Sequence, residues 1–217
     1  MCSSDLCNLH PRYRLIFAGN RDEFHDRPAA PLAWWEDQPE ILGGRDLEAR
    51  GTWLAVSRRG HFGVVTNYRD LQRPEPGAPS RGLLITRFLA GSAGAREFAE
   101  QLAPEASRFG GFNLLLADDR SMTYASNRAP DFARALEPGV YGLSNHLLDT
   151  PWPKLTLTRR RFEQALTADE PPFEVLFEML NDRAPVADHL LPSTGVSPEW
   201  EDRKSTRLNS SHLFISR

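Results

Sequence analysis

Short apolar stretches alternate with polar turns along most of the chain, and this pattern predicts strands joined in hairpins. The stretch YRLIFAG is short, apolar and followed at once by charged residues, which is typical of a buried strand. Further on, two pairs of apolar stretches are each separated by a few turn-forming residues, which favours two hairpins. The predicted strands cover residues 13–19, 51–57, 61–67, 110–118, 122–126 and 140–144.

Four other segments place apolar residues at helical spacing. Ser80 is expected to cap the first helix, and Thr150 with Pro151 to begin the third. Residues 24–40 contain several prolines and a pair of tryptophans, so we predict a loop there. Because hairpins dominate, antiparallel sheets in an α+β fold are favoured over a parallel βαβ fold. The predicted helices cover residues 80–90, 95–102, 150–166 and 174–181.

Composition narrows the class of protein. Of the 217 residues 40% are apolar, which fits a globular protein rather than a disordered one. The 26 basic and 29 acidic side chains are intermixed, so we expect no nucleic-acid partner. No apolar run approaches the roughly 20 residues that span a bilayer, so we expect no membrane span. The first residues lack the apolar segment of a secretory signal, and Cys2 and Cys7 cannot staple a domain of this size, so we expect a reducing, cytoplasmic setting.

Metal and phosphate chemistry is disfavoured by the spacing of the relevant residues. The six histidines show none of the patterns that bind zinc, and no glycine-rich phosphate loop occurs. We therefore expect no metal and no cofactor. The expected partner is a small-molecule substrate or ligand.

The two ends of the chain differ in character from the rest. Residues 202–217 are polar and basic without periodicity, and they resemble the translation of a sequencing adapter at the end of a gene fragment. Residues 2–6 (CSSDL) resemble the matching product at the other end. We therefore interpret 1–7 as a non-native segment, 8–201 as the domain, truncated at both ends, and 202–217 as a non-native or disordered tail that is dispensable for folding. A natural disordered tail is the alternative.

The polar cluster after the first predicted strand has the sequence NRDE at 20–23, which resembles the signature of the NRDE family. The eukaryotic member of this family is transport and Golgi organisation protein 2. Further blocks resemble the family in the same order, so the chain is identified as a member. These blocks are residues 43–70, 80–82, 111–118 and 141–154. The resemblance implies an α+β, N-terminal-nucleophile (Ntn) hydrolase-like fold, an αββα sandwich of two antiparallel sheets between helix layers.

The family begins with Met-Cys, so the resemblance implies that Cys2 is the catalytic nucleophile once Met1 is removed. An α-amine with a pKa near 8 can take the thiol proton, so that one residue supplies nucleophile and base. This sequence departs from the family directly afterwards, because Ser3-Ser4-Asp5 stands where the family has an apolar strand. Cys2 is therefore either the nucleophile or a coincidental match. Cys7 is the poorer candidate, since no processing signal would expose its amine.

Further site residues follow from the ends of the predicted strands. The resemblance implies that Arg21 stabilises a thiolate and that Asp22 orients the free amine; an ion-paired turn is the alternative. Asn67 and Asn145 each end a predicted strand, where an amide can serve as an oxyanion-hole donor, although Asn is also a common turn residue.

Four further residues are expected to contact a substrate. Of these, Arg45 is expected to bind a carboxylate, with an exposed ion pair as the alternative. Its neighbour Gly44 is expected to permit close backbone approach. Trp53 is expected in the core or in a pocket wall. The candidate substrate-binding residues are Asn20, Glu23, Arg45 and Trp53.

Two functions remain open from the sequence. The first is a cytoplasmic Ntn-type hydrolase that cleaves a small amide through a thioester on Cys2. The second is a non-catalytic carrier or regulator of a hydrophobic small molecule such as haem or lipid, as the family association implies. A truncated fragment that no longer works is a third reading. Likeness of fold alone cannot separate the first two.

Overall fold

The computed structural model describes residues 3–7, 10–21, 23, 26–69, 75–168, 170, 172–182 and 210–216. For 3–7 and 210–216 it describes the backbone only. The chain divides into two compact units. One consists of residues 1–23, 69–71 and 137–217, and the other of residues 24–68 and 72–136. The boundaries 8–201 expected for the family domain stay a prediction.

The second unit is built on a seven-stranded antiparallel sheet in the order β3-β4-β5-β6-β7-β8-β9. Neighbours in the sheet are also neighbours in the sequence, as the predicted hairpins require. The strands are β3 (Ala29–Trp34), β4 (Ile41–Asp46), β5 (Leu54–Ser57), β6 (Phe62–Asn67), β7 (Phe112–Ala117), β8 (Met122–Ser126) and β9 (Ala133–Leu136).

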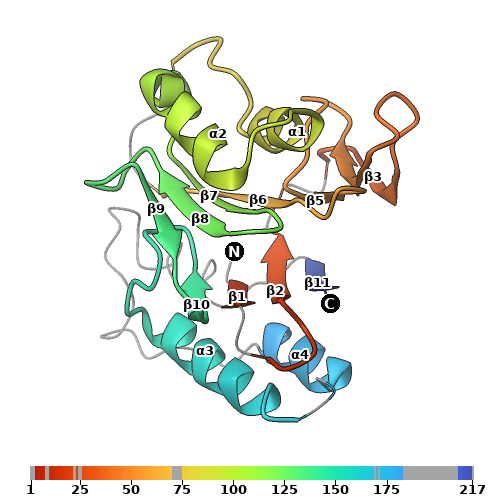
Figure 1. Ribbon diagram of the computed structural model, residues 1–217, viewed down its shortest axis with the longest axis vertical. Helices are drawn as coiled ribbons and strands as arrows, with labels where there is room; N and C mark the ends of the chain where they lie inside the picture. Colours follow the sequence, from red (N-terminus) through yellow and green to blue (C-terminus); the bar gives the residue numbers. More distant parts are fainter. Residues whose placement is uncertain are drawn as a thin grey trace. The chain divides into compact units, whose positions relative to one another are not determined.

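Helices α1 (Gly82–Ala90) and α2 (Ala95–Leu102) cover one face of this sheet (Figure 1), and a 3-10 helix, η1 (Ala103–Arg108), continues α2. The core lies between helices and sheet. It includes Leu84, Ile85, Phe88, Phe98, Leu102, Phe112, Leu114 and Leu116. The β7–β8 turn also fixes α2, because Asp118 Oδ2 accepts a hydrogen bond from the Ala95 amide at 2.6 Å. A distant aspartate thus caps this helix.

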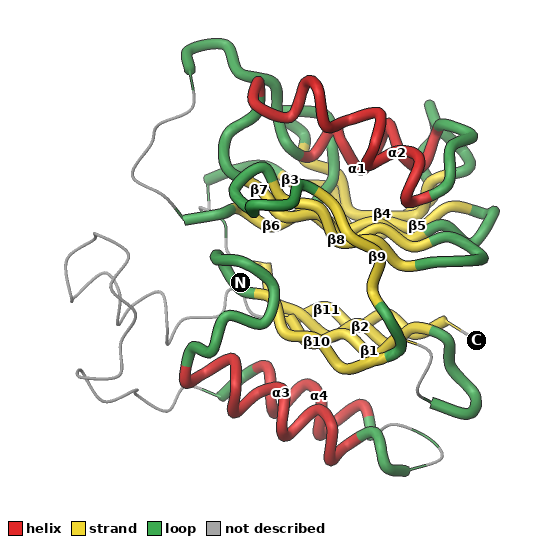
Figure 2. Tube along the Cα trace, turned by 60° about the vertical axis from the view of Figure 1, so that its left-hand side comes forward, coloured by secondary structure: helices red, strands yellow, loops and turns green. Residues whose placement is uncertain are grey.

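The first unit is built on a four-stranded sheet in the order β10-β1-β2-β11. Helices α3 (Pro153–Ala165) and α4 (Phe173–Leu180) lie side by side on one face of it (Figure 2). The core on that face comprises Tyr13, Ile16, Ala18, Phe162, Ala165, Leu176, Met179 and Leu180. The strands are β1 (Ser3–Cys7), β2 (Leu15–Arg21), β10 (Gly139–Leu143) and β11 (Ser210–Ser216).

Both predicted hairpins, the first strand and all four helices are confirmed within a few residues. The loop predicted over 24–40 is wrong for Ala29–Trp34, which forms the edge strand β3. Pro31 lies where the β3–β4 pairing shifts between Ala30 and Ala33, so its missing amide proton interrupts no regular ladder. Proline at this position is therefore compatible with an edge strand and does not require a loop.

The predicted helix caps are wrong. Arg81 precedes α1 and Trp152 precedes α3, and neither helix has a side-chain hydrogen bond at its cap residue. Ser80 instead accepts the Leu83 amide through its backbone carbonyl. Thr150 Oγ1 donates to the Leu147 carbonyl at 2.7 Å, within the loop before α3.

The two ends of the chain also differ from expectation. Ser3–Cys7 forms a strand despite its polar side chains, because it pairs with β2 on one side and β10 on the other. Backbone hydrogen bonds on both sides do not depend on apolar residues. A disordered tail is wrong for Ser210–Ser216, which pairs along its whole length with β2. The non-native origin of both segments stays a prediction.

Candidate functional site

The N-terminal end of β1 and the C-terminal ends of β2 and β10 lie at the same edge of the four-stranded sheet. Because β1 runs antiparallel to both neighbours, Ser3 pairs with Gly19 of β2 and Leu143 of β10. Arg21 is the last residue of β2, and Asn145 follows β10 by two residues. Two of the predicted site residues, Arg21 and Asn145, therefore follow the strand positions that pair with Ser3.

The polar residues at the end of β2 divide between its two faces, because side chains alternate along a strand. Asn20 is 2% exposed, and its Nδ2 donates to the Leu180 carbonyl at 3.1 Å, which fastens the end of α4 to the sheet. Arg21 has the opposite orientation. Its Nη2 lies 3.6 Å from Glu23 Oε2, and the two side chains are 15% and 26% exposed. A partly buried ion pair therefore marks this end of β2.

Asn145 is held through its backbone. Its carbonyl accepts a hydrogen bond from the Arg69 amide at 2.6 Å. The Arg69 guanidinium carbon lies 5.7 Å from the centre of the Trp152 ring, close enough for a cation–π contact. Sequence reasoning did not select Arg69, although it follows a predicted strand and precedes an aspartate, as Arg21 does.

His146, next to Asn145, is a further residue that sequence reasoning did not select. Its ring centre lies 5.6 Å from that of Trp152, with the two planes tilted by 45°. Burial lowers the pKa of His146, because it penalises the imidazolium. A neutral imidazole therefore lies beside the predicted oxyanion-hole residue. Its position after the Ser-Asn pair was the available signal in the sequence.

The other predicted site residues belong to the seven-stranded unit. Asn67 is the exposed last residue of β6. Arg45 does bind a carboxylate, but it is that of Asp37, which accepts from Nη1 at 2.5 Å and from Nη2 at 2.7 Å. The Arg45 guanidinium also lies 4.3 Å from the centre of the Trp35 ring and lowers the pKa of Asp37. The expected ion pair is present, and Arg45 as a substrate ligand stays a prediction.

Trp53 lies against the core of the seven-stranded unit. A Cβ atom at Gly44 would come within 2.8 Å of the Trp53 ring, so only glycine allows this close packing. The close approach expected at Gly44 is therefore confirmed, with a side chain rather than a ligand as the neighbour.

Two predicted catalytic residues, Cys2 and Asp22, lie outside the described residues. Within the described part of the chain, no three His, Cys, Asp or Glu side chains come together in a way that would hold a metal ion. The described helices are all too short or too polar to cross a membrane.

Comparison with known proteins settles the family. The sequence model of the family "Transport and Golgi organisation 2" matches residues 1–211 of the chain. The chain belongs to this family. It is similar to the Transport and Golgi organization 2 homolog of Mus musculus, with 37% identity over 206 residues, which cover 91% of this chain and 74% of the mouse protein. The NRDE resemblance drawn from the sequence blocks is thereby confirmed.

Two solved structures share the fold of this family member at low identity. The Caenorhabditis elegans ortholog of N-acylethanolamine-hydrolyzing acid amidase matches with a TM-score of 0.54 and 13% identity, over 97% of this chain and all of that one. Penicillin V acylase from Agrobacterium tumefaciens matches with a TM-score of 0.51 and 12% identity, over 95% of this chain and 78% of that one. The expected α+β, Ntn-hydrolase-like fold class is confirmed, and these identities support the fold alone.

Proposed function

We propose that this family member is an Ntn-type hydrolase that cleaves a small amide with Cys2 as its nucleophile, in a reducing, cytoplasmic setting. The observation that carries the proposal is the register of β1. Ser3 pairs with Gly19 of β2 and Leu143 of β10. Arg21 and Asn145 each lie two residues further along from these positions. Cys2 directly precedes Ser3 in the sequence, and Ser3 is the residue of β1 that pairs at this edge of the sheet.

The proposed chemistry uses one residue as both nucleophile and base. After removal of Met1, the α-amine of Cys2 takes the thiol proton, and the thiolate attacks the amide carbonyl. The carbon–nitrogen bond breaks, the leaving amine takes the proton from the ammonium group, and a thioester to Cys2 remains. Water then hydrolyses the thioester and regenerates the thiol. The cycle consumes one water and needs no metal or redox partner.

Arg21 and Asn145 have distinct roles in this proposal. Arg21 is partly buried at the end of β2, and its Nη2 lies 3.6 Å from Glu23 Oε2. A guanidinium so placed favours the thiolate over the thiol. The Asn145 amide donates to the developing oxyanion, and the hydrogen bond from the Arg69 amide to its carbonyl fixes the backbone from which it does so. Asp22 orients the free amine.

Thiol reactivity tests the proposal directly. Intact mass is measured first, to establish that Met1 is absent. Alkylation by iodoacetamide at pH 7 is then followed by mass spectrometry at Cys2 and at Cys7. An ordinary thiol has a pKa near 8.5, so an activated Cys2 should react several times faster than Cys7. Equal and slow labelling of both cysteines would show that this chain is not a hydrolase of this type, while its family and its fold would stand.

A matched pair of variants separates activation from general exposure. Arg21→Ala should slow alkylation of Cys2, because it removes the cation that favours the thiolate. Lys154→Ala removes a cation that donates to the Asp182 carbonyl at 3.2 Å in the same unit, and it should leave the rate unchanged. Hydrolysis of a panel of N-acyl aminocoumarins should be abolished by Cys2→Ala. Equal effects of Arg21→Ala and Lys154→Ala would overturn the role of Arg21.

The second candidate function is a non-catalytic carrier of a hydrophobic small molecule. Its support is the name of the mouse relative, which refers to transport and Golgi organisation and not to a reaction. This function needs no activated thiol. Slow labelling of Cys2, together with saturable binding of a fluorescent fatty acid to the full chain, would favour it over the hydrolase.

A further inference from the structure

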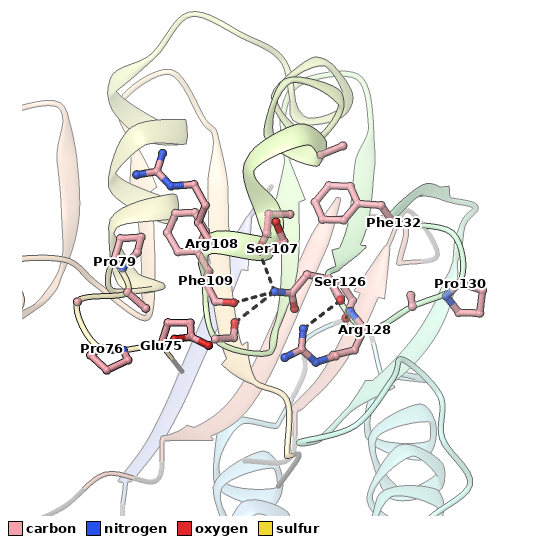
Figure 3. Close-up of a pocket in the computed structure, with 17 residues that line it drawn as sticks. Glu75, Pro76, Pro79, Ser107, Arg108, Phe109, Ser126, Arg128, Pro130 and Phe132 are labelled. Carbon is pink, nitrogen blue, oxygen red and sulfur yellow. Dashed lines mark hydrogen bonds between the residues drawn. The ribbon is translucent and has the colours of Figure 1, made fainter. Parts of the chain in front are cut away.

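A polar side chain can fix a loop by bonding to backbone groups outside it, and Asn127 is one example. Figure 3 shows its surroundings, a pocket of about 740 Å³ in the seven-stranded unit. Asn127 Nδ2 donates to the Phe109 carbonyl at 3.2 Å, and its Oδ1 accepts the Phe112 amide at 2.9 Å. None of the residues placed in the proposed hydrolase site lines this pocket. In the other unit Asp149 fixes a loop in the same way, and that loop carries Asn145.

Asp149 closes the loop that follows β10. Its backbone amide donates to the Gly142 carbonyl at 2.7 Å, and its Oδ1 accepts the Gly142 amide at 2.8 Å. We call this pair of hydrogen bonds the Gly142 clamp. Because β10 stands at the end of the strand order of its sheet, the clamp occupies the position that a further strand would take at Gly142.

The backbone of Asp149 adopts a conformation that most residues avoid. Its φ is 59°, in the left-handed region, where glycine is common and where asparagine and aspartate are among the best tolerated side chains. Such a conformation persists when the surrounding contacts hold it in place. Glycine would adopt it more easily, but glycine has no side-chain oxygen to accept the Gly142 amide. Asparagine has that oxygen and tolerates the backbone, so it is the conservative replacement.

Helix α3 supports the clamp from outside the loop. Arg159 Nη1 donates to the same Asp149 Oδ1 at 3.3 Å, and Arg159 Nε donates to Glu163 Oε1 at 3.2 Å. Gly142 also lies against this helix, because a Cβ atom there would come within 3.0 Å of Leu155 Cγ. The clamp therefore joins β10, the loop and α3. Glu163 offers a matched control, since it bonds to Arg159 and is not part of the clamp.

Asn145 lies between the two ends of the clamp, three residues after Gly142 and four before Asp149. Its carbonyl accepts the Arg69 amide at 2.6 Å, and Ser144 before it is buried. A donor to a developing oxyanion must be aimed accurately, and a displacement of about 1 Å can cost about 100-fold in rate. A shift of this loop should therefore slow the chemical step more than it weakens the binding of substrate.

We propose that Asp149 is a positioning residue for the proposed hydrolase site. Through the Gly142 clamp it fixes the loop from which Asn145 donates to the oxyanion and on which His146 lies. Asp149 acts through Asn145 and takes no part in the bond changes. The catalytic part of this inference rests on the proposed function, whereas the effect of the clamp on the loop can be measured without a substrate.

NMR of the ¹⁵N-labelled full chain tests the clamp. Asp149→Gly removes the acceptor and also relieves the strained backbone, so this variant should fold, as its melting temperature will establish. We expect the side-chain amide signals of Asn145 and the ring nitrogen signals of His146 to move in this variant. They should move much less in Asp149→Asn, which keeps an acceptor, and should stay in place in Glu163→Gln. Unmoved signals in Asp149→Gly would overturn the inference.

Kinetics of the same variants test the catalytic part. With an N-acyl aminocoumarin that the parent hydrolyses, Asp149→Gly should lower kcat by about 10–100-fold and change KM by less than about twofold. Asp149→Asn should restore most of kcat, and Glu163→Gln should retain it. An unchanged kcat in Asp149→Gly, or an equal loss in Glu163→Gln, would overturn the positioning role and leave the hydrolase standing. Absence of hydrolysis by the parent would overturn the proposed function and the catalytic part of this inference together, and the NMR signals would show separately whether the clamp fixes the loop.

Discussion

His146 Nδ1 lies 2.8 Å from Thr150 Oγ1, and the Thr150 hydroxyl lies 2.7 Å from the Leu147 carbonyl. A hydroxyl has one proton, and the carbonyl can only accept it. Thr150 Oγ1 is therefore the acceptor towards His146, so the proton of the neutral imidazole resides on Nδ1. The threonine predicted as a helix cap instead fixes the tautomer of the histidine that follows Asn145.

This relationship predicts the nitrogen chemical shifts of His146. At pH 7.5, ¹⁵N NMR of the labelled full chain should show a protonated Nδ1 and an unprotonated Nε2. Thr150→Val should weaken that preference and cost about 1 kcal/mol of unfolding free energy, the usual contribution of one hydrogen bond. Thr150→Ser keeps the hydroxyl and should preserve the tautomer. A ring protonated on Nε2 in the parent protein would contradict the hydrogen-bond assignment.

A second prediction concerns stability below neutral pH. His61 is 8% exposed, stacks on Phe88, and has a buried Nδ1 with no hydrogen-bond partner. Burial lowers the pKa of His61 and repulsion from Arg59 adds to this, although Asp118 and Asp119 act in the opposite direction. The unfolded chain, with a histidine pKa near 6.5, therefore binds the proton at higher pH than the folded chain does.

The sign follows from this difference. The contribution of His61 is fully present above about pH 6.5 and is lost as the pH falls through the lowered folded pKa. His146, whose pKa is also lowered by burial, acts in the same direction. Unfolding free energies from urea titration should therefore fall between pH 7.5 and 5.5, and His61→Gln should reduce that fall. An identical fall in His61→Gln would show that His61 does not carry the effect.

The packing of Gly44 against Trp53 gives a third prediction. A Cβ atom at Gly44 would lie 2.8 Å from two atoms of the Trp53 ring, so Gly44→Ala should cost about 1–3 kcal/mol through overpacking. Trp53→Leu removes the colliding ring, and the double variant should be less destabilised than the sum of the single ones. Urea unfolding of the three variants measures the coupling. Additive effects, within about 0.5 kcal/mol, would mean that the two residues do not collide.

Hairpins and helices were predictable where a local pattern dictates them. The β7–β8 turn is an example, since the Asp118 carboxylate accepts the amides of Arg120 and Ser121, an arrangement to which aspartate is suited. β1 was not predictable from its own polar residues, because its pairing is with β2 and with β10, a strand that is distant in the sequence. Local propensity carries no information about such partners.

The candidate site was predictable only in part, for a similar reason. Arg21 and Asn145 were selected because each follows a predicted strand, and that rule also applies to Arg69. What Arg69 does, however, depends on Asn145 and Trp152, which lie far along the chain. Asn20 illustrates the converse: its strand position was correct, but its amide contacts the end of α4.

The last prediction concerns the C-terminal strand, for which sequence and structure give opposite expectations. The polar, aperiodic sequence of 202–217 indicates a tail whose removal changes nothing. In the structure, each residue of Ser210–Ser216 pairs with a residue of Leu15–Arg21. Removal of β11 would leave the backbone N–H and C=O groups on one side of β2 without partners. Because β2 is almost wholly buried, these groups would be costly to leave unpaired.

We therefore expect deletion of residues 210–217 to lower the melting temperature by several degrees. A loss of 1 kcal/mol lowers it by about 2–4 °C in a chain of this size. Deletion of Arg217 alone keeps every pair of the ladder and serves as the control, which should melt with the parent. Differential scanning calorimetry of the three chains decides between the expectations. An unchanged melting temperature after the longer deletion would show that residues 210–217 are dispensable, as the sequence predicts, because removal of a strand that pairs with β2 should lower the free energy of unfolding.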